Sequence, residues 1–144
     1  MVRRAEKPDA AVIAALAVLL WEDNGAAELT EEFSALLADR EAAVFLVCDG
    51  DTPVGFAQCQ LRHDYVEGTQ TSPVGYLEGI FVKEEFRRRG LAGELLTACE
   101  EWAREKGCTE FASDCELANV DSARFHRAAG FSEANRIICF VKRL

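Results

Sequence analysis

The chain lacks the cysteine and histidine patterns that are typical of metal sites. It contains six cysteines but no Cys-x-x-Cys pair, and its two histidines, His63 and His126, have no metal-ligand spacing to a thiol. Most of the cysteines lie in apolar runs, where a thiol packs as a small hydrophobic group. A disulfide framework is the alternative, but we interpret these residues as buried, reduced thiols of a cytoplasmic protein. We therefore expect no structural metal.

Long apolar runs are also missing. No stretch approaches the ~20 residues that cross a bilayer as a helix, so we expect no membrane partner. Arg3 and Arg4, followed by the apolar stretch from Ala10 to Trp21, imitate a secretory signal. The segment from Glu6 to Asp9 interrupts that pattern with charges and a proline. We interpret the apolar stretch as a helix inside the domain.

Basic residues are scarce compared with acidic ones. Sixteen Lys and Arg stand against 25 Asp and Glu, for a formal net charge of −9. This balance argues against duplex nucleic acid as the main partner, because such binding needs many phosphate contacts. An acidic surface attracts cationic small molecules or basic peptides, although the charge can also serve solubility alone.

The chain has no linker, repeat or low-complexity tract, and its length and 49% hydrophobic content fit one domain over residues 1–144. A first helix is expected from Pro8 to about Trp21 or Glu22, and a second after Thr30 as its N-cap. Four apolar residues are predicted to share the inward face of the first helix: Val12, Leu16, Leu19 and Leu20. The remaining helices are predicted at Gly90–Lys106 and Asn119–Ala129, and the strands at Ala42–Cys48, Val54–Arg62, Gly75–Val82, Thr109–Ser113 and Asn135–Val141. This order predicts an α/β domain with a mixed sheet.

A basic turn separates the third predicted strand from the helix that follows it. The turn runs from Arg87 through Arg88 and Arg89 to Gly90 and contains three arginines in an otherwise acidic chain. Backbone N–H groups converge at a helix start, the helix dipole favours negative charge, and glycine lets a phosphate approach closely. The turn therefore predicts a site for a bound polyphosphate, with a solvated basic surface as the alternative.

The pattern Arg87-x-x-Gly90-x-Ala92 between a strand and a helix resembles the acetyl-CoA diphosphate motif of GNAT-type N-acetyltransferases. Asn119, the helix that includes Ser122 and His126, and the Gly130-Phe131 pair resemble the last helix and turn of that superfamily. The resemblance implies a mixed, mostly antiparallel central sheet with flanking helices. It also implies that two central strands splay apart to hold the pantetheine arm of acetyl-CoA.

A closer resemblance covers most of the chain. The segments Arg62–Thr69, Thr71–Val74, Leu77–Ile80 and Phe111–Asp114, together with Trp21, are similar to the aminoglycoside 6′-N-acetyltransferases. This similarity implies transfer of an acetyl group from acetyl-CoA to the 6′-amine of an aminoglycoside, directly and within a ternary complex. It also implies a homodimer.

The resemblance assigns residues to the acetyl donor. Backbone N–H groups and guanidinium charge from Arg87, Arg88, Arg89, Gly90, Leu91 and Ala92 would bind the diphosphate. A backbone N–H in Ile80-Phe81-Val82 would polarise the thioester carbonyl, and Gly79 is consistent with an irregular strand there. Asn119 would bond the pantetheine or order the turn before the last helix.

Glu78 and Asp114 are the candidate substrate acids. Glu78 stands inside an apolar strand, where an unpaired carboxylate is costly. In related enzymes the matching acids hold ammonium groups and help to remove the amine proton; the alternative is a structural carboxylate. His126 stands where many GNAT enzymes have a tyrosine that protonates the departing sulfur, and it either donates that proton or packs near the cofactor. Trp21 and Tyr65 offer flat faces to sugar rings, or fill the core.

Two other functions stay open from the sequence. One is a GNAT enzyme that acts on a polyamine or a protein N-terminus, which the negative charge suits equally well. The other is a non-catalytic acyl-CoA-binding module that regulates a partner.

Overall fold

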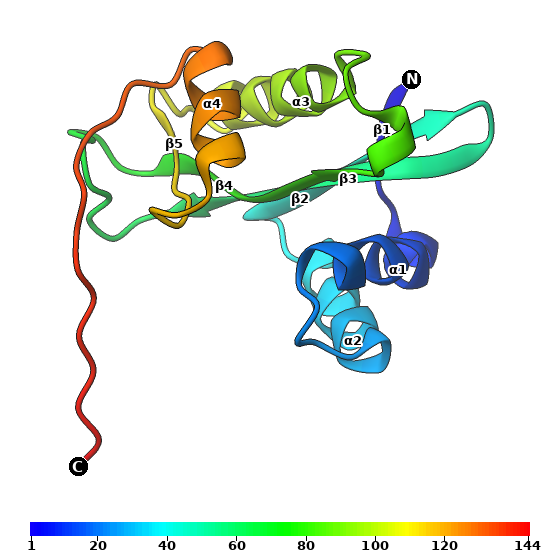
Figure 1. Cartoon of the computed structure of the whole chain (residues 1–144), viewed down its shortest axis with the longest axis horizontal. Coiled ribbons are helices and arrows are strands. Elements are labelled where there is room, and N and C mark those ends of the chain that lie inside the picture. Colours follow the sequence, from blue (N-terminus) through cyan, green and yellow to red (C-terminus); the bar gives the residue numbers. More distant parts are fainter.

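A five-stranded sheet forms the centre of the protein. The computed structural model describes all 144 residues, and its strands lie side by side in the order β1-β2-β3-β4-β5 (Figure 1). The first four strands pair antiparallel, and β5 pairs parallel with β4. The strands are β1 (Val2–Arg4), β2 (Ala42–Asp49), β3 (Thr52–Arg62), β4 (Val74–Val82) and β5 (Phe111–Ser113). The expected mixed, mostly antiparallel sheet is confirmed.

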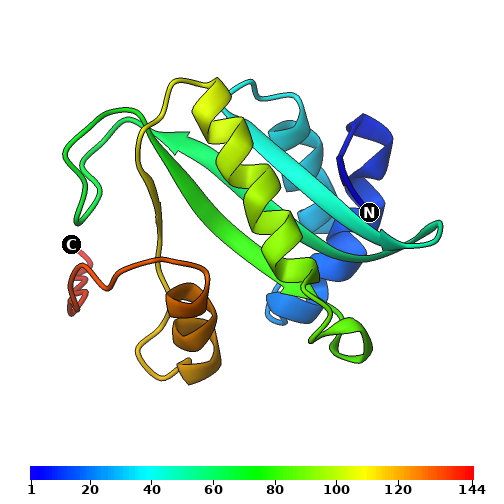
Figure 2. The same ribbon diagram turned by 90° about the horizontal axis from the view of Figure 1, so that it is seen from above.

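Helices cover both faces of this sheet. The hairpin of α1 (Ala10–Leu20) and α2 (Ala26–Leu37) lies on one face, and α3 (Leu91–Glu105) and α4 (Val120–Ala128) lie on the other (Figures 1 and 2). Short 3-10 helices, η1 (Lys7–Asp9) and η2 (Glu84–Phe86), precede α1 and α3. Each face has its own buried cluster of apolar side chains. Residues on opposite sides of the sheet therefore belong to two separate half-cores.

The helix α3 buries the face that its spacing predicts. Leu95, Cys99 and Trp102 are buried against the sheet, and Leu91 packs against the same cluster. Gly107 follows with a positive φ of 88°, in the position where glycine commonly ends a helix. The amphipathic pattern of this helix placed its N-terminus correctly beside the basic turn.

The helix α1 forms as expected but turns a different face inward. Its buried residues include Ile13 and Leu16, whereas Val12, Leu19 and Leu20 are exposed. The prediction for the last three was wrong, because every residue from Ala10 to Leu20 is apolar and no polar face fixes the orientation. Three alanines, Ala10, Ala14 and Ala17, are buried on the inward face as well.

Two other predictions were wrong, one at the start of a helix and one near the C-terminus. The second helix begins at Ala26 rather than after Thr30, and the Thr30 hydroxyl donates to the Ala26 carbonyl oxygen at 2.7 Å inside the helix. The expected strand at Asn135–Val141 is absent, because the segment extends away from the sheet and has no neighbouring strand to pair with (Figure 1). The strand β1, by contrast, was not expected.

The central strands separate halfway along β4, as the resemblance implied. The ladder between β4 and β5 ends at the pair Leu77 and Ser113, while β4 continues to Val82 paired only with β3. A bulge interrupts that second ladder, because Gln58 pairs with Gly79 and Cys59 with Leu77. Glu78 is the extra residue of this bulge, which re-aims a side chain and bends the strand.

Candidate active site

Glu78 forms an ion pair with Arg62 on the neighbouring strand. Nε of Arg62 donates to Oε1 of Glu78 at 3.0 Å, and Nη2 donates to Oε1 at 2.7 Å and to Oε2 at 3.0 Å. Both side chains are only partly accessible, with 20% of Glu78 and 38% of Arg62 exposed. The carboxylate that seemed costly in an apolar strand is therefore compensated by a guanidinium, and charge-assisted bonds of this kind are strong.

Asp114 joins the same group of residues through Tyr76. The Tyr76 hydroxyl donates to Oδ2 of Asp114, and the Arg62 guanidinium carbon lies 3.5 Å from the centre of the Tyr76 ring. Burial, and then the bond to Asp114, raise the pKa of the Tyr76 phenol well above its usual range, so the phenol stays protonated. The structure thus brings both candidate substrate acids together in one network with Arg62 and Tyr76.

A hollow of about 290 Å³ lies beside this network on the face that α1 and α2 cover. Trp21, at the end of α1, and Glu78 line it together, as do Gln58 of β3 and Glu32 of α2. The Trp21 ring also packs on Phe33 and Phe56, so it is part of the core and of the hollow at once.

Gly79 lies directly under the Trp21 ring. An added Cβ at this glycine would lie 2.7 Å from Cζ2 and 2.9 Å from Cη2 of the indole, closer than real contacts allow. The glycine therefore permits a close approach to the strand, and the approaching group is a side chain. This contact fixes the aromatic wall of the hollow against β4.

The predicted donor side lies at the other end of β4. Ile80, Phe81 and Val82 belong to the part of β4 that has no β5 partner. Arg87 folds back on this strand, because its Nε donates to the Val82 carbonyl oxygen at 2.7 Å and its guanidinium lies near the Phe81 ring. One of the three arginines therefore braces the strand end, and its remaining N–H groups are free of protein partners.

The turn itself has the backbone of a tight helix entry. Arg88 has a φ of 64° and Gly90 a φ of 77°, both in the left-handed region. A non-glycine residue in that region is uncommon and marks strain that frequently lies at functional sites. Arg88, Arg89 and Gly90 are exposed, and Leu91 and Ala92 begin α3 partly buried. The turn thus presents accessible positive charge at the start of a 15-residue helix.

His126 lies where β4 and β5 separate. Its Nδ1 is 2.7 Å from the Ser122 carbonyl oxygen, and its Nε2 is 2.8 Å from Oγ of Ser113. Because a carbonyl oxygen only accepts, Nδ1 carries a proton, and Nε2 either accepts from Ser113 or, in the charged ring, donates to it. Oγ of Ser113 also donates a hydrogen bond to the Leu77 carbonyl oxygen at 3.4 Å. The protein contact of Nε2 is therefore a hydroxyl, which can either donate or accept.

Asn119 caps the helix that carries His126. Its side-chain oxygen accepts from the backbone N–H of Ser122 at 3.1 Å, so it orders the turn before α4. Its side-chain nitrogen has no protein partner. One of the two expected tasks is therefore present in the protein itself.

Tyr65 does not join the other candidate substrate residues. It is 79% exposed in the loop after β3, and its hydroxyl donates to Oε2 of Glu67 at 3.0 Å. Asn135 of the C-terminal segment donates to Oε1 of the same glutamate at 2.8 Å. The loop is thus tied to the C-terminal segment rather than to the hollow.

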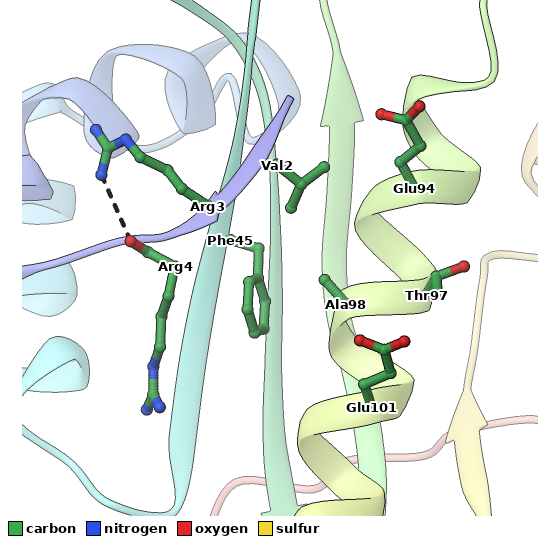
Figure 3. A pocket seen from close by; sticks show the side chains of 8 residues that line it. All are labelled: Val2, Arg3, Arg4, Phe45, Glu94, Thr97, Ala98 and Glu101. Carbon is green, nitrogen blue, oxygen red and sulfur yellow. Dashed lines mark hydrogen bonds between the residues drawn. The ribbon is translucent and has the colours of Figure 1, made fainter.

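A larger hollow of about 420 Å³ lies between β1 and α3, away from these residues (Figure 3). Glu94, Thr97 and Glu101 of α3 line one side of it, and Arg3 and Arg4 of β1 line the other. None of the predicted site residues contributes to it.

No group of three or more His, Cys, Asp or Glu side chains is arranged to hold a metal ion. No helix has both the length and the apolar character of a membrane span.

Sequence reasoning missed Arg62, Tyr76, Gln58 and Glu32 as site residues. A period of two was the available signal for the first three, because alternate residues of a strand share a face. Gln58, Gln60 and Arg62 form a polar series on β3, and Tyr76 precedes Glu78 by two residues. Nothing in the sequence indicated that Glu32 of α2 reaches the same hollow.

Comparison with known proteins agrees with this geometry. A sequence model of the acetyltransferase (GNAT) family matches residues 13–131. An aminoglycoside N(6′)-acetyltransferase type 1 of Stenotrophomonas maltophilia is 47% identical over 141 residues, which cover 96% of this chain and 90% of that protein. The aminoglycoside N-acetyltransferase AAC(6′)-Iy, solved in complex with CoA, superposes with a TM-score of 0.96 at 36% identity, covering 100% of this chain and 95% of that one. AAC(6′)-Ih from Acinetobacter baumannii gives a TM-score of 0.92 at 37% identity, with coverage of 100% and 98%. The chain therefore belongs to the acetyltransferase (GNAT) family.

Proposed function

We propose that the protein is an aminoglycoside 6′-N-acetyltransferase that moves the acetyl group of acetyl-CoA to the 6′-amine by direct attack in a ternary complex. The observation that carries this proposal is the position of the acid network beside the place where β4 separates from β5. Glu78 lines a hollow on one side of the sheet, Asp114 is linked to Glu78 through Tyr76 and Arg62, and the basic turn starts a helix on the other side. In this proposal donor and acceptor meet where the ladder between β4 and β5 ends.

The donor side suits the diphosphate and thioester of acetyl-CoA, which supplies an activated acetyl group. We assign diphosphate binding to the turn from Arg87 to Ala92, where amide groups and guanidinium charge favour anions. The N–H groups of Ile80, Phe81 and Val82 that face away from β3 are assigned to the pantetheine and to the thioester carbonyl. The free side-chain nitrogen of Asn119 is assigned to the pantetheine.

The acceptor side suits a cationic amine. Glu78 and Asp114 hold ammonium groups, and the amine proton passes to a carboxylate directly or through water. The amine nitrogen then forms its bond to the acetyl carbon as the carbon–sulfur bond breaks. His126 supplies a proton from Nε2 to the departing sulfur. Trp21 provides a flat face for a sugar ring in the hollow, and Tyr65 provides another in the loop.

We further propose a homodimer. The C-terminal segment exposes an apolar run in which Ile138 is 80%, Phe140 90% and Val141 92% exposed. So large an unpaired apolar segment is typical of an interaction site, and β5 is a three-residue edge strand with one free side. Sedimentation of the protein at micromolar concentration tests this proposal, and a monomer would refute it.

The proposal treats residues 1–144 as one acetyltransferase domain, because elements from Val2 to Ala128 belong to one sheet and its two helical layers. It assigns the protein to the cytoplasm. All six cysteines are free, and Cys59, Cys99 and Cys108 are buried, which suits a reducing compartment.

A thiol-release assay with acetyl-CoA and a panel of amines tests the function. Release of CoA with kanamycin supports the proposal, whereas release only with polyamines or peptide N-termini assigns another acceptor. If acetyl-CoA binds tightly but no amine causes the release of CoA, the protein is a non-catalytic module. Glu78→Gln and Asp114→Asn should weaken turnover of aminoglycosides while acetyl-CoA binding persists, and unchanged kinetics in both variants would remove the acceptor assignment.

A further inference from the structure

Arg62, Tyr76, Glu78 and Asp114 form one continuous chain of contacts across three strands. Arg62 ends β3, Tyr76 and Glu78 lie on β4, and Asp114 follows β5. Each contact is direct: guanidinium to carboxylate, guanidinium to ring face, and phenol to carboxylate. Tyr76 is only 6% exposed, so the central member of the chain has little freedom to move.

The network uses the four carboxylate oxygens unequally. Oε1 of Glu78 accepts two bonds and Oε2 accepts one, all from Arg62. Oδ2 of Asp114 accepts the Tyr76 hydroxyl, and no protein group donates to Oδ1. Asp114 as a whole is exposed. One carboxylate is therefore neutralised by an internal cation, and the other is held at one oxygen with the second open.

We propose that Arg62 and Tyr76 are positioning residues that hold the two acids as one unit, so that Oδ1 of Asp114 receives the ammonium group of the substrate. This inference rests on the proposed function. The two residues touch the acids and not the reacting atoms. Arg62 reaches Asp114 only through the Tyr76 ring, and the phenol fixes the rotation of the Asp114 carboxylate.

Steady-state kinetics test the positioning role. Tyr76→Phe keeps the ring under Arg62 but removes the bond to Asp114, and Arg62→Gln removes the cation. Each should lower kcat/KM for kanamycin about tenfold, the size of one lost charge-assisted bond, while KM for acetyl-CoA stays within about twofold. The double variant should fall no further than the worse single variant, because Arg62 acts on Asp114 only through the Tyr76 ring and the phenol is the group that bonds Asp114. Arg62→Lys keeps the positive charge but cannot form the paired bonds to Glu78. Its kcat/KM for kanamycin should therefore lie between the values of Arg62→Gln and the wild type.

The exposed Arg40 provides a matched control, because its side chain has no bond within the protein. Arg40→Gln should leave both constants at the wild-type values. The proposal is overturned if Tyr76→Phe behaves like this control. It is equally overturned if the losses of Arg62→Gln and Tyr76→Phe multiply in full, because independent effects exclude a unit.

A second measurement separates this inference from the proposed function. The chain has two tyrosines, so ring signals of tyrosine-labelled protein are assigned by comparison with Tyr65→Phe. In the free protein, both Arg62→Gln and Asp114→Asn should shift the Tyr76 ring signal, and kanamycin should shift it in the wild type. An unshifted signal in Asp114→Asn overturns the network even in an active enzyme. A shifted signal in both variants, with no effect of kanamycin and no release of CoA, supports the network and overturns the acceptor role.

Discussion

Gly79→Ala tests how the aromatic wall of the hollow beside Glu78 is built. The added methyl group would lie 2.7 Å and 2.9 Å from two atoms of the Trp21 ring, so one group must move by about 1 Å to reach ordinary contact distance. The indole cannot simply withdraw, because it stacks on Phe33 and meets the edge of Phe56 with ring centres 6.5 Å and 6.0 Å away.

The expected cost follows from this overlap. Overpacking of a core typically costs about 1–3 kcal/mol, and replacing glycine by alanine returns about 0.4–1 kcal/mol by restricting the unfolded chain. We therefore expect Gly79→Ala to lower the free energy of unfolding by about 1–2 kcal/mol, and Tm by about 3–7 °C. Displacement of Trp21 should also lower kcat/KM for aminoglycosides and leave KM for acetyl-CoA unchanged.

Urea unfolding followed by circular dichroism measures the loss, and two further variants isolate its cause. Gly93 lies in α3 with open space around it, so Gly93→Ala should be at least as stable as the wild type. Trp21→Phe removes the outer part of the indole that meets the new methyl group, so adding Gly79→Ala to it should cost nothing further. If Gly79→Ala costs as much in the Trp21→Phe background as in the wild type, the contact with Trp21 is not the cause.

Three further results are expected. Gly90→Ala should lower the free energy of unfolding by about 1 kcal/mol, because the φ of 77° at this position is unfavourable for alanine. No atom obstructs the added methyl group, so the backbone alone causes the loss. A gain in stability, as expected for Gly93→Ala, would contradict the left-handed turn. Two hydrogen bonds from Arg3 hold the pKa of Asp9 at about 2, below the ~3.9 of an unfolded chain. Asp9→Asn should therefore lower stability above about pH 4, by about 1 kcal/mol or less for so accessible a pair, and the difference should vanish as the pH falls toward 2; urea unfolding at several pH values measures it, and a pH-independent difference would contradict the ion pair. Deletion of residues 135–144 should convert the proposed dimer to a monomer that sediments at half the mass, and an unchanged mass would place the dimer contact elsewhere.

Periodicity predicted the parts of the fold whose side chains have one apolar and one polar face. The helix α3 is the clearest case, because its buried residues recur at helical spacing between polar ones. The helix α1 has no polar face, so its existence was predictable and its orientation was not. The three residues of β1 include two arginines and show no alternation that separates an edge strand from a charged terminus.

The candidate site was predictable where a residue type is unusual for its place. Glu78 in an apolar strand and three arginines before a helix are of this kind, and both lie where the sequence predicted. The bulge at Glu78 was not predictable, because only the neighbouring Gly79 hints at it. Arg62 and Tyr76 look like ordinary strand residues until the ladder between β3 and β4 brings them into contact. The segment 135–141 has strand-like composition, but a strand also needs a partner, which composition cannot supply.

In the proposed function the strand β4 serves both substrates, and this has a consequence for how the enzyme can diversify. A change in its backbone would disturb the proposed sites of acetyl donor and amine acceptor together, whereas α1 and α2 flank the hollow beside Glu78 alone. Selection by a new antibiotic should therefore accumulate substitutions first in those peripheral segments, and leave the shared strand as it is.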